Sequence, residues 1–241
     1  MPQPLWSPSK SAIANSAMTA FAHYAETTYQ HTFADYNSLH AWSVAQPELF
    51  WAALWDYLQI KSSIKSAKTV ENFDSFPGAR WFPGARMNFA ENLLRERGSK
   101  IALVSVLENG ERYTTSYAEL YQQVTCVAQQ LRDLGVGVNQ RVAAWLPNTT
   151  EAVVTMLATS SLGAIFSSCS PDFGEQGALD RFSQIAPNVL VASTGYYYAG
   201  KTIDIRDKVR GVAAQVPSIK QIVWVNTLNT RLRCETGEAL W

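Results

Sequence analysis

Cysteine and histidine are scarce in this sequence, with three of each in 241 residues. The cysteines (Cys126, Cys169 and Cys234) are odd in number and lie far apart. Small secreted scaffolds depend on dense, paired cysteines, and structural zinc sites depend on closely spaced Cys and His ligands. The sequence therefore predicts no disulfide framework and no metal site, and it favours a reducing, cytoplasmic location.

Net charge and long apolar runs are also lacking. Twenty basic side chains balance twenty acidic ones, so no long-range field draws the chain toward nucleic acid or an anionic membrane. No run approaches the roughly 18 to 20 apolar residues that a membrane-spanning helix needs. The first ten residues, MPQPLWSPSK, are not the basic start of a signal peptide. We expect neither a nucleic-acid partner nor a membrane partner.

A glycine-rich phosphate loop is missing as well. The run GVGVNQ at 135–140 lacks the third glycine of G-x-G-x-x-G and follows a predicted helix instead of a strand. The small-residue run ATSSLGAIFSSCSP at 158–171 contains no lysine to meet phosphate charge. We therefore expect no triphosphate site in this chain, and we assign no catalytic residue.

What the sequence does contain is ample material for a core, since 47% of the residues are hydrophobic. Residues 1–60 have helical periodicity, and Pro47 is placed to begin a helix that carries Trp51 and Trp55 one turn apart. An aromatic stripe of this kind typically docks onto another domain. Residues 61–90 contain the pentapeptide FPGAR twice, and each Pro-Gly pair predicts a tight turn in an irregular connector.

From residue 100 the pattern changes to short strands and amphipathic helices. KIALVSVL followed by ENGERYTT predicts two strands around Asn109-Gly110, a pair that favours a hairpin with a type I′ turn. Ser116 and Glu119 form a capping box for a helix whose inward face runs to Leu134. A second capping pair, Asn148 and Glu151, is expected to open the next helix. Parallel strands are expected near 141, 164, 188 and 219.

These elements predict an α/β fold in two parts. Residues 1–99 form a helical cap with an irregular connector. Residues 100–241 form a β-hairpin and a partial, mostly parallel sheet with flanking helices, and the hairpin adds an antiparallel edge strand. Parallel sheets bind ligands at the carboxyl ends of their strands. We therefore expect a site among three turns, LPNTT, SCSPDFGE and STGYYYAGK.

Several stretches resemble the AMP-forming short-chain acyl-CoA synthetases of the adenylate-forming superfamily. RWFPGARMNFAENLLR resembles a characteristic motif near their amino terminus, and LHAWSVAQPELFWAALWDY resembles their N-terminal cap. LPNTTEAVVTMLATSSLGAIFSSCSPDFG resembles their first nucleotide-fold segment, and YYYAGKTID also matches. The stretch SSCSPDFG is most similar to the acetoacetate–CoA ligases among them. The fold implied is an incomplete adenylate-forming N-domain.

The resemblance implies a two-step reaction for the full-length family. ATP with magnesium activates acetoacetate as an acyl-adenylate, and CoA then gives acetoacetyl-CoA and AMP. The family's phosphate loop, adenine pocket, acyl pocket and catalytic lysine would all lie beyond Trp241. We therefore expect a truncated portion that is inactive alone and binds none of these cofactors strongly.

The same resemblance implies part of a CoA site in this chain. The turn Ser170, Pro171 and Asp172 would lie beside CoA, and Lys201 would reach its 3′-phosphate as a point charge. Tyr198 stands where acetate-type relatives carry a second arginine. Without the resemblance, Lys201 is interpreted as a surface residue that precedes a helix. Asp172 is then interpreted as the cap of the helix that follows Asp172. Arg181 is interpreted as structural.

Two other functions stay open at this point. The chain could be a non-catalytic fragment that acts as a CoA-binding or subunit-interaction module, with self-association through an exposed sheet edge. It could also be part of an acetate–CoA or propionate–CoA ligase, because the residues that select the acyl group are not in this sequence.

Overall fold

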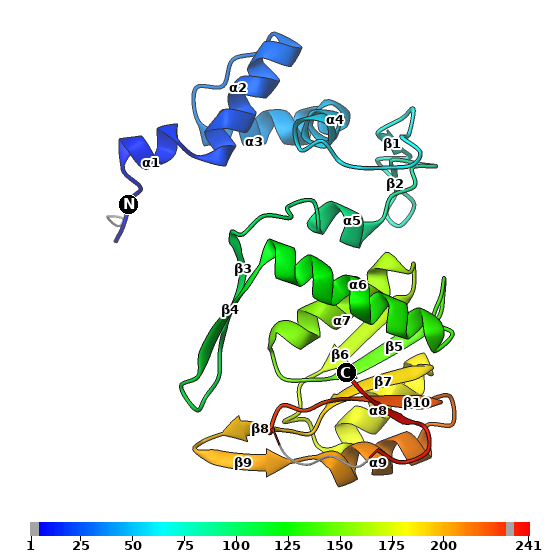
Figure 1. Ribbon diagram of the computed structural model, residues 1–241. Helices are drawn as coiled ribbons and strands as arrows, with labels where there is room; N and C mark the ends of the chain where they lie inside the picture. Colours follow the sequence, from blue (N-terminus) through cyan, green and yellow to red (C-terminus); the bar gives the residue numbers. More distant parts are fainter. Residues whose placement is uncertain (1–4, 230–233) are drawn as a thin grey trace. The chain divides into compact units, whose positions relative to one another are not determined.

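The computed structural model describes residues 5–229 and 234–241 (Figure 1). The chain folds as two compact units: the first ends at Met87, and the second runs from Asn88 to Trp241. The first unit is helical with one short hairpin, and the second is built on a parallel sheet. The predicted α/β class, with helices ahead of a parallel sheet, is confirmed.

Four helices form most of the first unit. Side-chain caps open three of them: the hydroxyls of Ser9 and Ser16 accept from the N–H groups of Ala12 and Thr19 (both 3.1 Å), and Asp35 forms a capping box with Ser38. Helix α4 begins at Pro47, as predicted. The helices are α1 (Lys10–Ala14), α2 (Ala17–Tyr29), α3 (Tyr36–Ala45) and α4 (Pro47–Tyr57). Their core consists of buried Phe21, Ala25, Leu39, Trp42 and Ala53.

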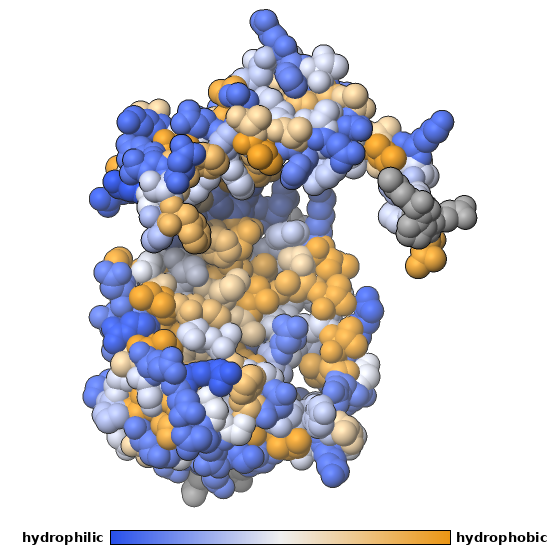
Figure 2. Space-filling view, turned by 180° about the vertical axis from the view of Figure 1, so that it is seen from behind, coloured by the Kyte–Doolittle hydropathy of each residue, from blue (hydrophilic) through white to orange (hydrophobic). Residues whose placement is uncertain are grey.

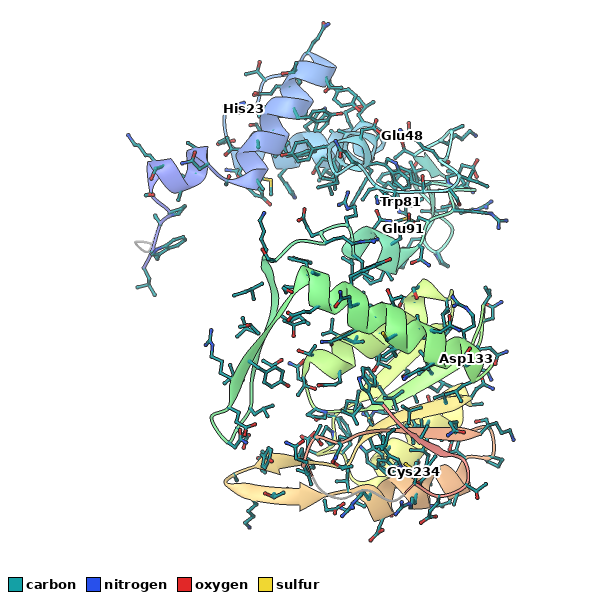
Figure 3. All side chains as sticks on the ribbon, in the orientation of Figure 1. His23, Glu48, Trp81, Glu91, Asp133 and Cys234 are labelled. Carbon is teal, nitrogen blue, oxygen red and sulfur yellow. The ribbon has the colours of Figure 1, made fainter. Side chains whose placement is uncertain are left out.

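The connector that carries the repeated FPGAR packs against α4. The ring centroids of Trp55 and Phe82 are 4.5 Å apart, and those of Trp51 and Trp81 are 5.6 Å apart. Trp81 marks the connector in Figure 3, on strand β2 (Arg80–Trp81), which pairs with β1 (Val70–Glu71). These rings of α4 contact the connector of their own unit, and docking of the stripe onto another domain stays a prediction.

The two copies of FPGAR adopt different conformations. In the second, the Ala85 N–H donates to the Phe82 carbonyl (3.0 Å) and Gly84 takes a φ of 80°, as in a type II turn. In the first, the Ala79 N–H reaches back four residues to the Ser75 carbonyl (3.0 Å). The tight turn predicted for a Pro-Gly pair is therefore present in the second copy, while the first makes a wider turn.

A five-stranded sheet lies at the centre of the second unit. Its order is β11-β10-β7-β5-β6, and every neighbouring pair is parallel. The four strands expected from the sequence are all present. The sequence carries no signal for β11, since it has only three residues and one of them is charged. The strands are β5 (Arg141–Trp145), β6 (Ile165–Cys169), β7 (Val189–Ser193), β10 (Gln221–Val225) and β11 (Glu238–Leu240).

Helices cover both faces of this sheet (Figure 1). On β5, Val142 and Ala144 join one core with α6 and α7, while Ala143 and Trp145 join the other with α8 and α9. Because the central strands are buried on both faces, they read as continuous apolar runs in the sequence. The helices are α5 (Phe89–Leu93), α6 (Tyr117–Asp133), α7 (Thr150–Ser161), α8 (Glu175–Ile185) and α9 (Arg206–Gln215).

The helix ends follow the predicted caps in one case and depart from them in two. The capping box of Ser116 and Glu119 is present at the start of α6. Leu134 does not belong to the inward face of α6, because it is the C-cap and is exposed. At the start of α7 the N-cap is Thr149 instead of Asn148, and its hydroxyl donates to the Glu151 carboxylate (2.5 Å).

The predicted hairpin forms from β3 (Ile101–Val106) and β4 (Arg112–Ser116), but two details differ. It is a separate two-stranded sheet, so the expectation that it adds an edge to the parallel sheet is wrong. The turn is not type I′, because Gly110 has a φ of 88° whereas Asn109 is not left-handed. The Gly110 N–H bonds to the Leu107 carbonyl (3.0 Å), as expected of a longer loop that ends in a left-handed glycine.

A second hairpin follows β7, where the sequence indicates only a turn. It consists of β8 (Gly195–Tyr198) and β9 (Lys201–Asp204), paired antiparallel. Ala199 and Gly200 both have positive φ, 49° and 73°, and this combination defines a type I′ turn. The prediction placed such a turn at Asn109-Gly110, whereas the structure has it here.

Candidate functional site

The carboxyl ends of the parallel strands border a hollow of about 560 Å³ in the second unit. All three turns predicted at this edge contribute to its wall: residues 147–149 after β5, 170–172 after β6 and 196–198 on β8. Residues 225–227 at the end of β10 and the β3–β4 hairpin complete it. The three turns expected at this edge thus line one hollow, and its role as a ligand site stays a prediction.

The turn Ser170, Pro171 and Asp172 is held by a buried indole from the neighbouring strand. Trp145, at the end of β5, is completely buried and donates its Nε1 hydrogen to the Ser170 carbonyl (3.0 Å). The Phe173 N–H closes the turn on the same carbonyl (3.2 Å). Two adjacent strands therefore fix the position of this turn at the hollow.

Asp172 faces the hollow and does not cap a helix. Helix α8 has Gly174 as its N-cap with no side-chain cap bond, so the alternative role of Asp172 as a cap is wrong. Burial raises the pKa of Tyr196 above its usual value, and the charge of Asp172 raises it further. Burial also raises the pKa of the Cys169 thiol to about 12, with a further contribution from Asp172.

The β8–β9 hairpin separates the two remaining predicted residues. Tyr198 lines the hollow, and Lys201 is its cross-strand partner outside the lining. Lys201 is exposed and begins β9, which leads into α9, so the alternative that it is a surface residue ahead of a helix stays open. Within residues 5–229 and 234–241, no ion pair involves its ammonium group. Lys201 is therefore an exposed cation one cross-strand pair away from the lining residue Tyr198.

A buried junction sets the direction in which this hairpin leaves the sheet. Thr194 is fully buried, its N–H donates to the Val225 carbonyl (2.9 Å), and its hydroxyl accepts from the Leu228 N–H (3.3 Å). A Cβ at Gly195 would lie 2.2 Å from the Ile203 carbonyl oxygen. Any side chain at Gly195 would meet the backbone of the paired strand β9, so the position requires glycine.

The charged side chains in the wall are all acidic. They are Glu108, Glu111, Glu151 and Asp172, and none of the described lining residues is basic. The pKa of Tyr113 is raised, chiefly by burial and next by the charge of Glu151. The interior of the hollow is therefore electrostatically unfavourable for a phosphate group.

The tips of the β3–β4 and β8–β9 hairpins lie close together (Figure 1), and residues of both hairpins line the hollow. At their tips, the Ala199 N–H donates to the Glu108 carboxylate (2.9 Å). Along the hairpin strands, the hydroxyls of Ser105 on β3 and Thr115 on β4 lie 3.0 Å and 3.4 Å from that of Thr150, and all three side chains are buried. The first hairpin is therefore tied both to α7 and to the second hairpin.

The structure brings together four of the five site residues predicted from the sequence, namely Ser170, Pro171, Asp172 and Tyr198. It leaves Lys201 just outside. Sequence reasoning missed Glu108 and Tyr113, because no local pattern places them beside residues some ninety positions later in the chain. The contact between hairpin tips is visible only in three dimensions.

Two further classes of site were sought among the described residues. No cluster of three or more histidine, cysteine or acidic side chains is placed to hold a metal ion within 5–229 and 234–241. Over the same residues, the helices lack the length and apolar character of a membrane span.

Comparison with known protein families gives two matches along the chain. Residues 89–238 match the family described as AMP-binding enzyme, and residues 36–93 match the acetyl-coenzyme A synthetase N-terminus. The first match contains the whole hollow. The second contains α4 and the connector packed on it.

Individual relatives agree with these matches. Acetoacetyl-coenzyme A synthetase from Rhizobium meliloti is 43% identical over 92% of this chain and 34% of its own length. Malonamoyl-CoA synthetase from Penicillium aethiopicum is 34% identical over 90% of this chain and 31% of its own. The solved acetoacetyl-CoA synthetase from Streptomyces lividans has a TM-score of 0.93 and 38% identity over 100% of this chain and 37% of that one. The chain spans about a third of the length of these relatives.

Proposed function

The chain belongs to the AMP-binding enzyme family, and on that premise we propose that it is the amino-terminal portion of an acetoacetate–CoA ligase. The reaction of the complete enzyme would convert ATP, acetoacetate and CoA to acetoacetyl-CoA, AMP and pyrophosphate. Within it, this portion would contribute part of the surface that binds CoA. Its cytoplasmic location stays a prediction.

One observation carries the proposal: three separate turns of the sequence converge on one hollow at the carboxyl edge of the sheet. The same turns lie within the stretch that matches the AMP-binding family. Strand ends of a parallel sheet collect loops from distant parts of the chain, which is why ligands bind there. Similarity to acetoacetyl-CoA synthetases over 92% of the chain supports the choice of enzyme.

The residues present fit CoA in a specific way. The acidic interior, with Glu108, Glu151 and Asp172, disfavours phosphate and suits an uncharged part of the ligand. The exposed ammonium of Lys201 lies one cross-strand pair from Tyr198, which lines the hollow. We therefore assign the 3′-phosphate to Lys201 at the rim, and the uncharged arm to the wall formed by residues 170–172.

This assignment is tested by comparing CoA with 3′-dephospho-CoA in ligand-observed NMR titrations. An exposed lysine–phosphate pair is worth about 0.2–1 kcal/mol, so CoA should bind about 1.5- to 5-fold more tightly than the dephospho form. Lys201→Ala should remove that preference. The matched control Lys208→Ala removes an exposed charge from α9 of the same unit and should keep it. Absence of CoA binding, or equal effects of the two variants, would contradict the assignment.

Adenylation by the chain alone is not expected. The sequence contains no lysine-bearing glycine, serine or threonine loop for a triphosphate, and the acidic hollow offers no replacement. Incubation with ATP, magnesium, acetoacetate and hydroxylamine should give no acyl-hydroxamate above a blank without ATP. An ATP-dependent product would show that this portion carries its own adenylation site.

Two alternatives are kept, each for a stated reason. A different acyl substrate, such as acetate or propionate, is compatible with this portion, because malonamoyl-CoA synthetase is also a relative at 34% identity. A role in subunit interaction or self-association is supported by strand β6, which pairs on one side only among residues 5–229 and 234–241.

A further inference from the structure

The two hairpins that line the hollow are attached to the second unit in different ways. Each is a two-stranded sheet of its own, and such hairpins are marginally stable in isolation. Hairpin β3–β4 is tied to α7 by the buried hydroxyls of Ser105 and Thr115, which approach that of Thr150. Hairpin β8–β9 is tied at the start of β8, where the Thr227 hydroxyl donates to the Gly195 carbonyl (2.6 Å).

The turn of β8–β9 lies well beyond this attachment. Tyr198 ends β8 three residues after Gly195, which is about 10 Å along an extended strand. Hydrophobic residues are exposed in patches on the surface of the second unit (Figure 2), and Tyr198 is itself 56% exposed. Because core packing does not fix this end of the hairpin, the positions of Tyr198 and Lys201 depend on what holds the turn.

The carboxylate of Glu108 holds this turn. Ala199 belongs to neither strand of the hairpin, and its N–H donates to Glu108 at 2.9 Å. Hydrogen bonds to an ionised acceptor are stronger than those between neutral groups. Ala199 follows Tyr198 directly and comes two residues before Lys201. The better-anchored hairpin thus fixes the end of the other one through a single side chain.

We propose that Glu108 is a positioning residue for CoA: it holds the turn of β8–β9 so that Tyr198 lines the hollow and Lys201 meets the 3′-phosphate at the rim. This inference rests on the proposed CoA site. Glu108 does not bind the phosphate, because two anions repel each other. The role requires its acceptor oxygen and not its negative charge, so substitutions can separate the two.

Solvent exchange of the Ala199 amide hydrogen, measured by NMR without ligand, tests the contact itself. Glu108→Ala removes the acceptor and should speed exchange about 3- to 10-fold. The matched control Glu111→Ala removes the same charge from an exposed position of the same hairpin and should leave the rate close to that of the parent. Circular dichroism melting verifies that each variant is folded. Equal exchange rates in the two variants would overturn the inference.

The affinity for CoA relative to 3′-dephospho-CoA tests the consequence for binding. The parent should prefer CoA about 1.5- to 5-fold, and Glu108→Ala should abolish this preference. Glu108→Gln removes the same charge but keeps an acceptor oxygen, so it should retain the preference. Loss of the preference in both variants, or in neither, would overturn the role of Glu108. A parent without any preference would instead refute the proposed CoA site, and the exchange rates would still decide whether Glu108 holds the turn.

Discussion

Gly195→Ala should destabilise the second unit more than any ordinary surface substitution. Gly195 follows the buried Thr194 and begins β8, where it is paired with Asp204 at the end of β9. The added Cβ would lie 2.2 Å from the Ile203 carbonyl oxygen and 2.5 Å from Leu228 Cδ1. The leucine side chain can rotate away, but the carbonyl belongs to the backbone of the paired strand and cannot move without breaking the hairpin.

The size of this loss of unfolding free energy depends on which atoms must move to relieve the clash. Overpacking costs typically 1–3 kcal/mol when side chains can adjust, so a clash with backbone places the loss of unfolding free energy at about 3 kcal/mol. For a unit of this size, about 2–4 °C of melting temperature accompanies each kcal/mol. The expected decrease is therefore about 6–12 °C in the transition of the second unit.

Urea unfolding and calorimetry measure this effect, with Gly98→Ala as the control. A Cβ at Gly98 would have nothing within 4 Å, and Gly98 has no positive φ, so the control should change stability by no more than about 0.5 kcal/mol. Both variants add one methyl group, at Gly195 against backbone atoms and at Gly98 into open space. If Gly195→Ala costs no more than Gly98→Ala, the account of the β7–β8 junction is refuted.

Two further predictions concern ionisable groups. Burial acts to raise the pKa of Glu238, but the hydrogen bonds that its carboxylate accepts, chiefly from Arg210, lower the pKa below the reference value of 4.5. The ionised carboxylate therefore stabilises the fold above pH 4.5, and this stabilisation is lost as the pH falls through the lower pKa of the folded state. Glu238→Gln should therefore be less stable than the parent at pH 7, with the difference shrinking in acid, and a difference independent of pH in urea titrations would contradict this. Burial raises the pKa of Cys169 to about 12, so iodoacetamide at pH 8 should label the exposed Cys126 and Cys234 before unfolding and Cys169 after it. Mass spectrometry that finds all three labelled at one rate in the folded protein would refute the buried thiol.

The helices and strands of this protein follow largely from local sequence. The capping box of Ser116 and Glu119 forms as predicted, because its groups are three residues apart and satisfy each other within one turn. Pro47 begins α4 for a similar reason, since the missing N–H costs nothing in the first turn. The four main parallel strands are visible as apolar runs because helices bury both of their faces.

The turn of the β3–β4 hairpin was less predictable than the hairpin itself, and the β8–β9 hairpin was not predicted. Asn109-Gly110 has the composition of a type I′ turn, but the chain uses a longer loop there. The type I′ turn occurs instead at Ala199-Gly200, where alanine is an unusual choice for positive φ. Pairing between β8 and β9 holds that residue in the left-handed region, and pairing is a tertiary property that composition alone does not reveal.

The position of the candidate site could be predicted from the sequence, whereas the residues that line it could not. The position of the site at the carboxyl ends of the strands could be predicted, because the alternation of strands and helices dictates a parallel sheet. Its contents could not. Glu108 reaches the site through a hydrogen bond to Ala199 across 91 positions of sequence, and Lys201 is left at the rim by one cross-strand step. The functional division at residues 99 and 100 stays a prediction, since compactness separates the chain at Met87 without assigning roles.

By itself, the sequence determined the fold class, the family resemblance and the edge of the sheet where a ligand would bind, because periodicity, caps and motifs act over a few residues. Only the tertiary structure decided that the interior of the hollow is acidic and that Lys201 lies outside it. These properties depend on which distant segments meet, and the free energy of such meetings comes from packing over the whole unit.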